Sequence, residues 1–137
     1  VYSTSAIEVT LEIPDGAKKL ELKSYAGTYT WGDEVVFADA ALTAAGTFPA
    51  PDDWGPNEYY LSDLEWVSAT HGDATTTKTV QKDHPFTPGN NGNDTKISLL
   101  MPDGTVRTFD KGLGTVAASP SIITYNLTGA RVSELHT

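Results

Sequence analysis

"AIEVTLEI", residues 6–13, is the clearest secondary-structure signal in the chain. Apolar and polar side chains alternate along it with a period of two, which indicates a β-strand with one buried face. The apolar members of the alternation are Ile7, Val9, Leu11 and Ile13. We therefore predict a half-buried strand here, followed by a turn at "PDG", residues 14–16.

Short strand-like runs continue along the rest of the chain, and no stretch supports a long amphipathic helix. These runs are "KKLELKSY" (18–25), "EVVFADAAL" (34–42), "EYYLSDLEWVSA" (58–69) and "SIITYNLTG" (121–129). "TKISLLMPDGTVRTFDKG", residues 95–112, predicts a hairpin around a second "PDG". Many short strands separated by glycine and proline turns favour an all-β sandwich. Residues 43–58 contain three prolines and no periodicity, so we interpret them as a linker or long loop.

Composition narrows the classes of function. The chain has 137 residues, 39% of them hydrophobic, a net charge of −9 and no cysteine. An acidic chain is a poor partner for nucleic acid, and no apolar run approaches the length of a membrane span. We therefore expect no nucleic acid and no membrane insertion. An acidic surface suits a secreted protein, a neutral ligand such as a sugar, or a bound cation.

Catalytic motifs are absent from the sequence. No G-x-S-x-G elbow, P-loop or H-E-x-x-H is present, and no motif relates the three histidines. We therefore predict that the chain is not an enzyme. Carboxylates are abundant, and Asp33 and Asp39 are candidate ligands for calcium, which prefers oxygen atoms. EF-hand spacing is not present, so the alternative is that these carboxylates are simply solvated.

Three motifs in the second part of the chain occur in the order of one family. They are "YLSDLEW" (60–66), "VQKD" (80–83) and "FDKGLGTVAASPSIITYNLTG" (109–129). In this order they resemble the NPCBM family of carbohydrate-binding modules. The resemblance implies a galactose-binding-like jelly-roll sandwich. It also implies attachment to secreted glycoside hydrolases and a preference for galactose-containing glycans.

The two parts of the chain resemble this family in reversed order. Residues 1–42 resemble the closing strands of a module and residues 59–137 its opening strands, with residues 43–58 between them. The chain is then the junction of two tandem modules, a permuted sandwich, or an assembly subunit completed by strand exchange with other copies. A sandwich that lacks strands exposes edge amides and an apolar groove, and both attract a strand from outside.

Sugar binding needs an aromatic platform and planar polar groups. Our candidate carbohydrate contacts are Trp54, Tyr59, Trp66, His71 and Gln81. Trp66 alternates with Leu64, so a core or edge position is the alternative for it, and we expect Tyr60 to be a core residue. Several positions depart from the polar residues of the family pattern, namely Glu34, Val36, Phe37 and Val116. Either the sugar site has moved, or this copy retains the fold for a structural purpose.

Two hypotheses for function follow. The first is a non-catalytic carbohydrate-binding module of a secreted or cell-surface protein, with a galactose-containing glycan as its partner. The second is a structural subunit of an extracellular filament, surface layer or adhesin, which forms homo-oligomers or polymers through strand exchange. Because Val1 is not an initiator methionine, we expect a processed product or a piece of a longer protein.

Overall fold

A computed structural model describes residues 5–26, 34–44, 58–71, 79–86, 96–117, 120–128 and 132–137. This described part is all-β, as predicted, and contains no α-helix, so it has no helix that could cross a membrane. Its first strands are β1 (Thr10–Glu12), β2 (Lys19–Ser24), β3 (Glu34–Ala38), β4 (Ala41–Ala44), β5 (Glu58–Tyr60), β6 (Ser68–Thr70) and β7 (Gln81–Lys82). The others are β8 (Ile97–Leu100), β9 (Val106–Phe109), β10 (Gly112–Val116), β11 (Ser121–Asn126) and β12 (Val132–His136), with a 3₁₀ turn, η1 (Leu61–Asp63).

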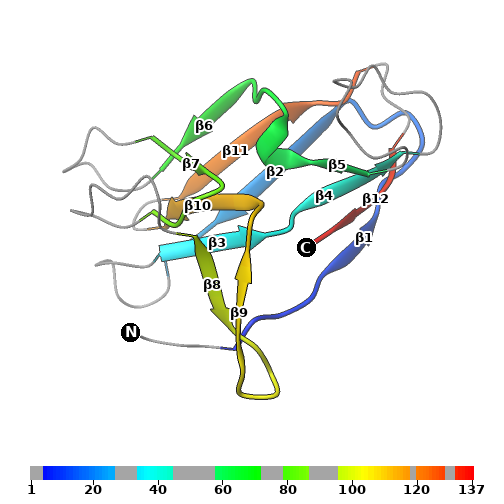
Figure 1. Ribbon diagram of the computed structural model, residues 1–137. Coiled ribbons are helices and arrows are strands. Elements are labelled where there is room, and N and C mark those ends of the chain that lie inside the picture. Colours follow the sequence, from blue (N-terminus) through cyan, green and yellow to red (C-terminus); the bar gives the residue numbers. More distant parts are fainter. Residues whose placement is uncertain are drawn as a thin grey trace.

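The strands form antiparallel sheets in the orders β1-β12-β4-β5, β3-β10-β7, β2-β11-β6 and β8-β9. In Figure 1 the β2-β11-β6 sheet lies behind β3, β4 and β10. The main core contains side chains from β4, β5, β10, β11 and β12, and partly buried residues of β2 and β6 pack against it. Antiparallel layers around one core are consistent with a β-sandwich. The galactose-binding-like jelly-roll topology stays a prediction.

The first four strands are built into the sheets of the later strands. β1 pairs with β12, β2 with β11, β3 with β10, and β4 with both β12 and β5. None of the ladders in the described residues joins two of the strands β1 to β4. The two parts of the chain therefore complete one fold together. Whether their order is permuted relative to the family stays a prediction.

The main core contains fully buried apolar side chains and one buried tyrosine hydroxyl that has a hydrogen-bond partner. Leu42, Leu113 and Ile123 are fully buried. The hydroxyl of Tyr125, which is 2% exposed, donates to the carbonyl oxygen of Leu61 at 2.9 Å. A buried hydroxyl needs such a partner because its hydration is lost. Burial raises the pKa of Tyr125, so the phenol stays protonated and able to donate.

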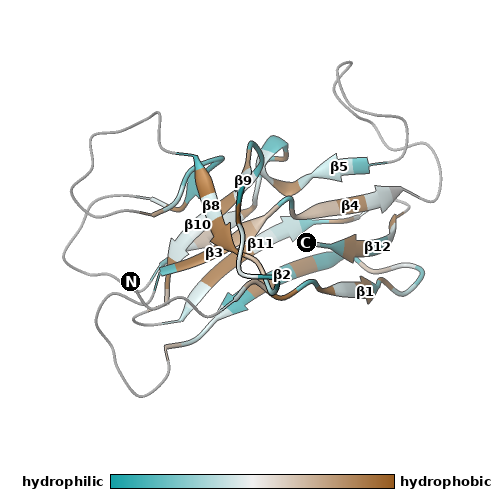
Figure 2. Cartoon of the chain, turned by 60° about the horizontal axis from the view of Figure 1, so that its bottom comes forward, coloured by the Kyte–Doolittle hydropathy of each residue, from teal (hydrophilic) through white to brown (hydrophobic). Residues whose placement is uncertain are grey.

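The β8–β9 hairpin confirms the interpretation of the second "PDG" and covers a separate, smaller core. Ile97 and Phe109 pack with Ala38 of β3, away from the main core. In Figure 2 the hydrophobic residues of β8 are brown, and this strand lies beside β3 and β10. The turn is held by Asp103, whose carboxylate accepts from the amide of Thr105 at 2.9 Å.

The opening stretch behaves only partly as predicted. Its strand forms and pairs with β12, but most of its apolar face is exposed, and only Ile13 packs against the main core. Ile7 is 80% exposed and Leu11 is 54% exposed. The reason is that β1 ends its own sheet while β2 ends the sheet opposite, so no described strand covers this face.

Candidate functional site

Three motif segments converge on one ammonium group. The Nζ atom of Lys111, from the "KGLG" segment, lies 2.5 Å from an Asp63 carboxylate oxygen and 3.4 Å from one of Asp83. Asp83 also accepts from the amide of Gly112 at 3.1 Å, so this aspartate fixes the backbone at the start of β10. Burial alone lowers the pKa of Lys111, but the hydrogen bond to Asp63 and the charge of Asp83 outweigh it and raise the pKa overall. We call Asp63, Asp83 and Lys111 the Lys111 cluster.

The glycines of "KGLG" let backbone segments approach closely. A Cβ atom on Gly114 would lie 2.7 Å from the amide nitrogen of Phe86 and 2.8 Å from the carbonyl carbon of Pro85. Real side chains do not tolerate such distances to backbone atoms. Gly114 therefore brings the segment after β7 against β10, and this contact places Asp83 beside Lys111.

A half-buried tyrosine lies beside this cluster. Tyr60 belongs to β5, directly before η1, and its side chain is within the electrostatic reach of Glu58, Asp39 and Lys111. Burial is the main cause that raises the pKa of Tyr60, and the negative charges of Glu58 and Asp39 add to it. The hydroxyl is therefore a stable donor at neutral pH.

Further charged groups surround this tyrosine. His136 Nε2 lies 2.9 Å from Glu58 Oε1, and a nitrogen of Arg107 lies 4.0 Å from Asp39. Burial raises the pKa of Asp39, while the charge of Arg107 opposes that rise. We use the name Tyr60 patch for Asp39, Glu58, Tyr60, Asp63, Arg107, Lys111 and His136. The patch offers an aromatic ring, hydrogen-bond acceptors and cationic donors together, which is the chemistry that sugar hydroxyls and C–H faces require.

The metal prediction finds no support in the described residues. They contain no group of three or more histidines or carboxylates that could hold an ion. Asp33 lies outside the described residues, and Asp39 is the residue paired with Arg107. Calcium binding stays a prediction.

The predicted aromatic contacts have different environments. Trp54 lies outside the described residues. Tyr59 is 5% exposed and belongs to the main core, whereas Tyr60 is only half-buried, the reverse of the expectation for Tyr60. Trp66 packs against the main core, and the ammonium of Lys82 lies 4.8 Å from its ring centroid. One face of this indole is therefore occupied by a cation–π contact.

His71 and Gln81 complete the predicted set. The His71 ring centroid lies 5.1 Å from that of the buried Phe86, and the Gln81 side-chain amide donates to the Thr79 carbonyl at 2.6 Å. Trp66 and His71 flank opposite ends of β6, about 16 Å apart along extended chain. The predicted residues thus do not form one cluster.

Comparison with known proteins agrees with the motif order. The NPCBM/NEW2 domain matches residues 57–137, more than half of the chain. The chain belongs to the NPCBM/NEW2 family. It is also 62% identical over 77 residues to the blood-group-substance endo-1,4-beta-galactosidase of Clostridium perfringens. That alignment covers 56% of this chain but only 10% of the galactosidase, so the chain spans a small part of that relative. No solved structure matches the chain.

Most residues of the Tyr60 patch lie within the part of the chain that matches the NPCBM/NEW2 domain. Its members Tyr60, Asp63, Lys111 and His136 lie in residues 57–137, whereas Asp39 comes from the preceding part of the chain. The positions that depart from the NPCBM pattern mostly pack inward. Val116 is 4% exposed, Phe37 contacts the main core, and Val36 contacts the hairpin core. Apolar residues at these positions stabilise packing.

The sequence contained one overlooked signal for this patch. Alternation in "EYY", residues 58–60, puts Glu58 and Tyr60 on the face opposite Tyr59. Once Tyr59 is assigned to the core, Tyr60 must face outward. No comparable signal identifies His136.

Proposed function

We propose that this NPCBM/NEW2 chain is a non-catalytic carbohydrate-binding module that binds galactose-containing glycans at the Tyr60 patch. The observation that carries this proposal is the convergence of the family motifs beside a half-exposed tyrosine. The relative that shares 62% identity is named as a galactosidase acting on blood-group substance, which supports galactose as the sugar class.

The Tyr60 patch suits a neutral sugar. One face of a galactose ring carries several C–H groups, which pack against an aromatic ring. Its hydroxyls can donate to the carboxylates of Glu58 and Asp39 and accept from Arg107 or Lys111. Hydrogen bonds to charged groups are the stronger kind, worth about 1.5–3 kcal/mol each. Both signs of charge are present, so the ligand itself needs no charge.

Localisation follows from the ligand class. Complex glycans are displayed outside cells, so we place the module in a secreted or cell-surface protein. The module binds its glycan without cleaving it, so the purified chain should release no sugar from a galactoside substrate.

Titration calorimetry with lactose, followed by a glycan array rich in terminal and internal galactose, tests the site. We expect binding to weaken about ten-fold or more in Tyr60→Ala, because an aromatic contact and a hydroxyl are both lost. Tyr25→Ala is the matched control, since Tyr25 is 67% exposed and lies beyond the end of β2.

The same titrations test the contacts predicted from sequence. If His71→Ala or Gln81→Ala abolishes binding while Tyr60→Ala does not, the sugar lies near β6 and β7, and the Tyr60 patch is the wrong site. If no galactose-containing glycan on the array binds the wild-type chain, the proposed function itself is wrong.

A further inference from the structure

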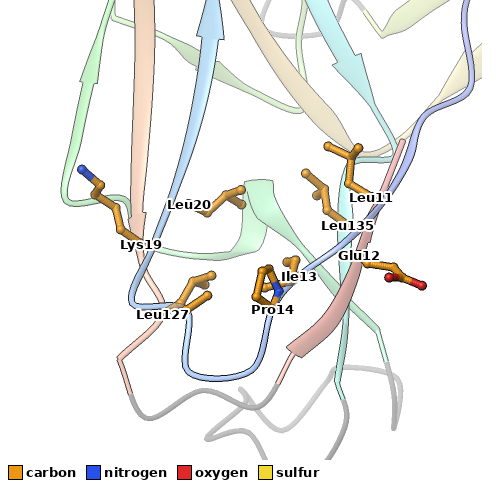
Figure 3. A pocket seen from close by; sticks show the side chains of 9 residues that line it. Leu11, Glu12, Ile13, Pro14, Lys19, Leu20, Leu127 and Leu135 are labelled. Carbon is orange, nitrogen blue, oxygen red and sulfur yellow. The ribbon is translucent and has the colours of Figure 1, made fainter.

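Within the part of the chain that the structure describes, β1 and β2 each end a sheet, and together they leave an open flank. Between them lies a hollow of about 190 Å³. It is lined by Leu11, Glu12, Ile13, Pro14, Ala17, Lys19, Leu20, Leu127 and Leu135. In Figure 3 the aliphatic side chains face the hollow, while the charged ends of Glu12 and Lys19 point away from it. The hollow has few hydrogen-bonding groups, so it suits apolar side chains and not a sugar.

The backbone of β1 presents alternate amides to the outside. Val9 and Thr137 exchange hydrogen bonds, and the amide of Ile13 donates to Ser133. Odd-numbered residues of this strand therefore bond to β12. In an antiparallel ladder the intervening residues face the other way. The amides and carbonyls of residues 8, 10 and 12 thus face the free edge.

The backbone of β2 also presents alternate amides to the outside, but here the odd-numbered residues face outward. The amide of Leu127 donates to the carbonyl of Lys18, in register with the β2–β11 ladder. Even-numbered residues of β2 therefore bond to β11, and residues 19, 21 and 23 face its free edge. Leu20 and Leu22 pack toward the main core, so the side chains of the odd-numbered residues lie on the outer surface.

We infer that the free edge of β1 pairs, antiparallel, with the free edge of β2 in a second copy of this chain. One register brings all the outward-facing amides opposite one another: Glu12 with Lys19, Thr10 with Glu21 and Glu8 with Lys23. The same register sets Leu11 opposite Leu20 and Val9 opposite Leu22 on the inner face. Leu11 and Val9 of one copy then contact Leu20 and Leu22 of the other as cross-strand neighbours.

Charge complementarity selects this pairing over the alternatives. Glu8 and Glu12 meet Lys23 and Lys19, which also pair with Glu21 of their own strand. Opposite charges that face each other across strands are favourable. If two β1 strands paired around Thr10, Glu8 would face Glu12. If two β2 strands paired around Glu21, Lys19 would face Lys23. Like charges directly opposite are destabilising, so both self-pairings are disfavoured.

The association should be weak. The paired segments are short, well below the roughly 800 Å² per partner of a standard interface, and the net charge of −9 makes two copies repel. At about 0.15 M salt the repulsion is screened beyond about 8 Å, whereas contacts within the paired strands are screened less. Each copy carries one β1 edge and one β2 edge, so either a symmetric dimer or a longer chain of copies can form.

Sedimentation velocity of the purified chain at physiological salt, from micromolar to millimolar protein, measures the association. We expect the mass to rise above 14.6 kDa with concentration. Thr10→Pro should abolish the rise, because proline removes an outward N–H and is tolerated on a strand edge. Thr10→Val, which keeps the N–H, is the matched control, and circular dichroism checks that both variants fold.

Charge reversal provides a second test that leaves the backbone intact. Glu12→Lys alone and Lys19→Glu alone should each weaken association about two- to five-fold, because each places like charges opposite. The double variant restores opposite charges across the edge and should recover the wild-type association. A wild-type chain that stays at monomer mass up to millimolar concentration would overturn the inference. Association that Thr10→Pro does not change, or single reversals that the double variant does not rescue, would also overturn it.

Discussion

The two flanks of this molecule use similar connections with opposite results. On the closed flank, η1 and residues 64–67 lead from β5 to β6, and Leu61 within them is fully buried. On the open flank, residues 13–18 lead from β1 to β2. Leu11, in the strand just before this connection, is 54% exposed. The closed flank is fastened by Tyr125 and by the Lys111 cluster. An apolar residue next to such a connection is therefore buried only where another layer of the fold lies opposite it.

The largest expected effect contrasts two leucines. Leu42 is fully buried and Leu11 is half exposed, so the same truncation removes different amounts of packing. We expect Leu42→Ala to lower the free energy of unfolding by about 2–5 kcal/mol and Leu11→Ala by less than about 1 kcal/mol. Urea denaturation of both variants measures the difference, and equal losses would mean that β1 is buried in solution.

Next is the contrast between two glycines. Gly114→Ala places a Cβ against the backbone of Phe86 and Pro85, which cannot move aside cheaply. We expect a loss of about 3 kcal/mol. Gly16, on the open flank, has φ +77° with no atom within 4 Å of an added Cβ. Gly16→Ala should therefore cost only the conformational strain, about 1 kcal/mol. Thermal melts of the two variants should keep this order, and a reversed order would show that the segment after β7 does not pack on β10.

The contrast between two tyrosines is smaller. Tyr125→Phe leaves the Leu61 carbonyl without its hydroxyl donor in the core, at a cost of about 1–2 kcal/mol. Tyr25→Phe is the control, because Tyr25 is 67% exposed and water replaces any lost hydrogen bond. Urea midpoints should fall only for Tyr125→Phe. An unchanged midpoint would mean that η1 is not anchored to β11.

The pH dependence of stability should also differ between the two flanks. Asp39 lies near the closed flank. Burial raises the pKa of Asp39, with Arg107 opposing, so the folded state holds this proton more tightly than the unfolded chain. Ionising Asp39 therefore lowers the free energy of unfolding. This loss is absent below pH 3.8, the ordinary pKa of an aspartate, and is complete once the pH has risen through the raised pKa of the folded state. Asp39→Asn removes it and should stabilise the fold at pH 7 by less than about 0.5 kcal/mol. This gain should disappear below about pH 4, and a gain that persists at pH 3 would assign the effect to packing.

Glu21 on the open flank has the opposite sign and a small effect because it is exposed to water. Hydrogen bonds from Lys19 and Lys23 lower its pKa from 4.5 to about 2. Its contribution to stability is therefore present above pH 4.5 and is lost as pH falls toward 2. In Glu21→Gln this component of the acid dependence should vanish. Thermal midpoints of both proteins between pH 7 and pH 2 test it, and identical curves would show that these exposed pairs contribute nothing.

Much of the fold could be predicted from local pattern. The period-two alternation identified β1 and β2, and the two "PDG" turns marked two of the connections. Tyr59 and Tyr60 show where such reasoning stops. Both suit a strand, but only the ladder with β4 and the contacts with β11 and β12 decide which ring enters the core.

The candidate site was harder to predict from the sequence than the fold was. The residues of the Lys111 cluster all lie within motifs that the sequence singled out, but Asp63 and Lys111 are 48 residues apart. Asp83, 28 residues from Lys111, reaches the same ammonium group through the close approach that Gly114 permits between β10 and the segment after β7. Trp66 and His71 looked like neighbours in sequence, and one intervening strand separates them.

The sequence by itself determined the all-β class, the turns, the absence of cysteine chemistry and the family, because these depend on residue type and short-range order. The tertiary structure alone decided which apolar faces are covered, which carboxylates meet Lys111 and which strand edges stay open. Those outcomes depend on contacts between residues far apart in the chain, and no local pattern encodes which layer lies opposite a strand.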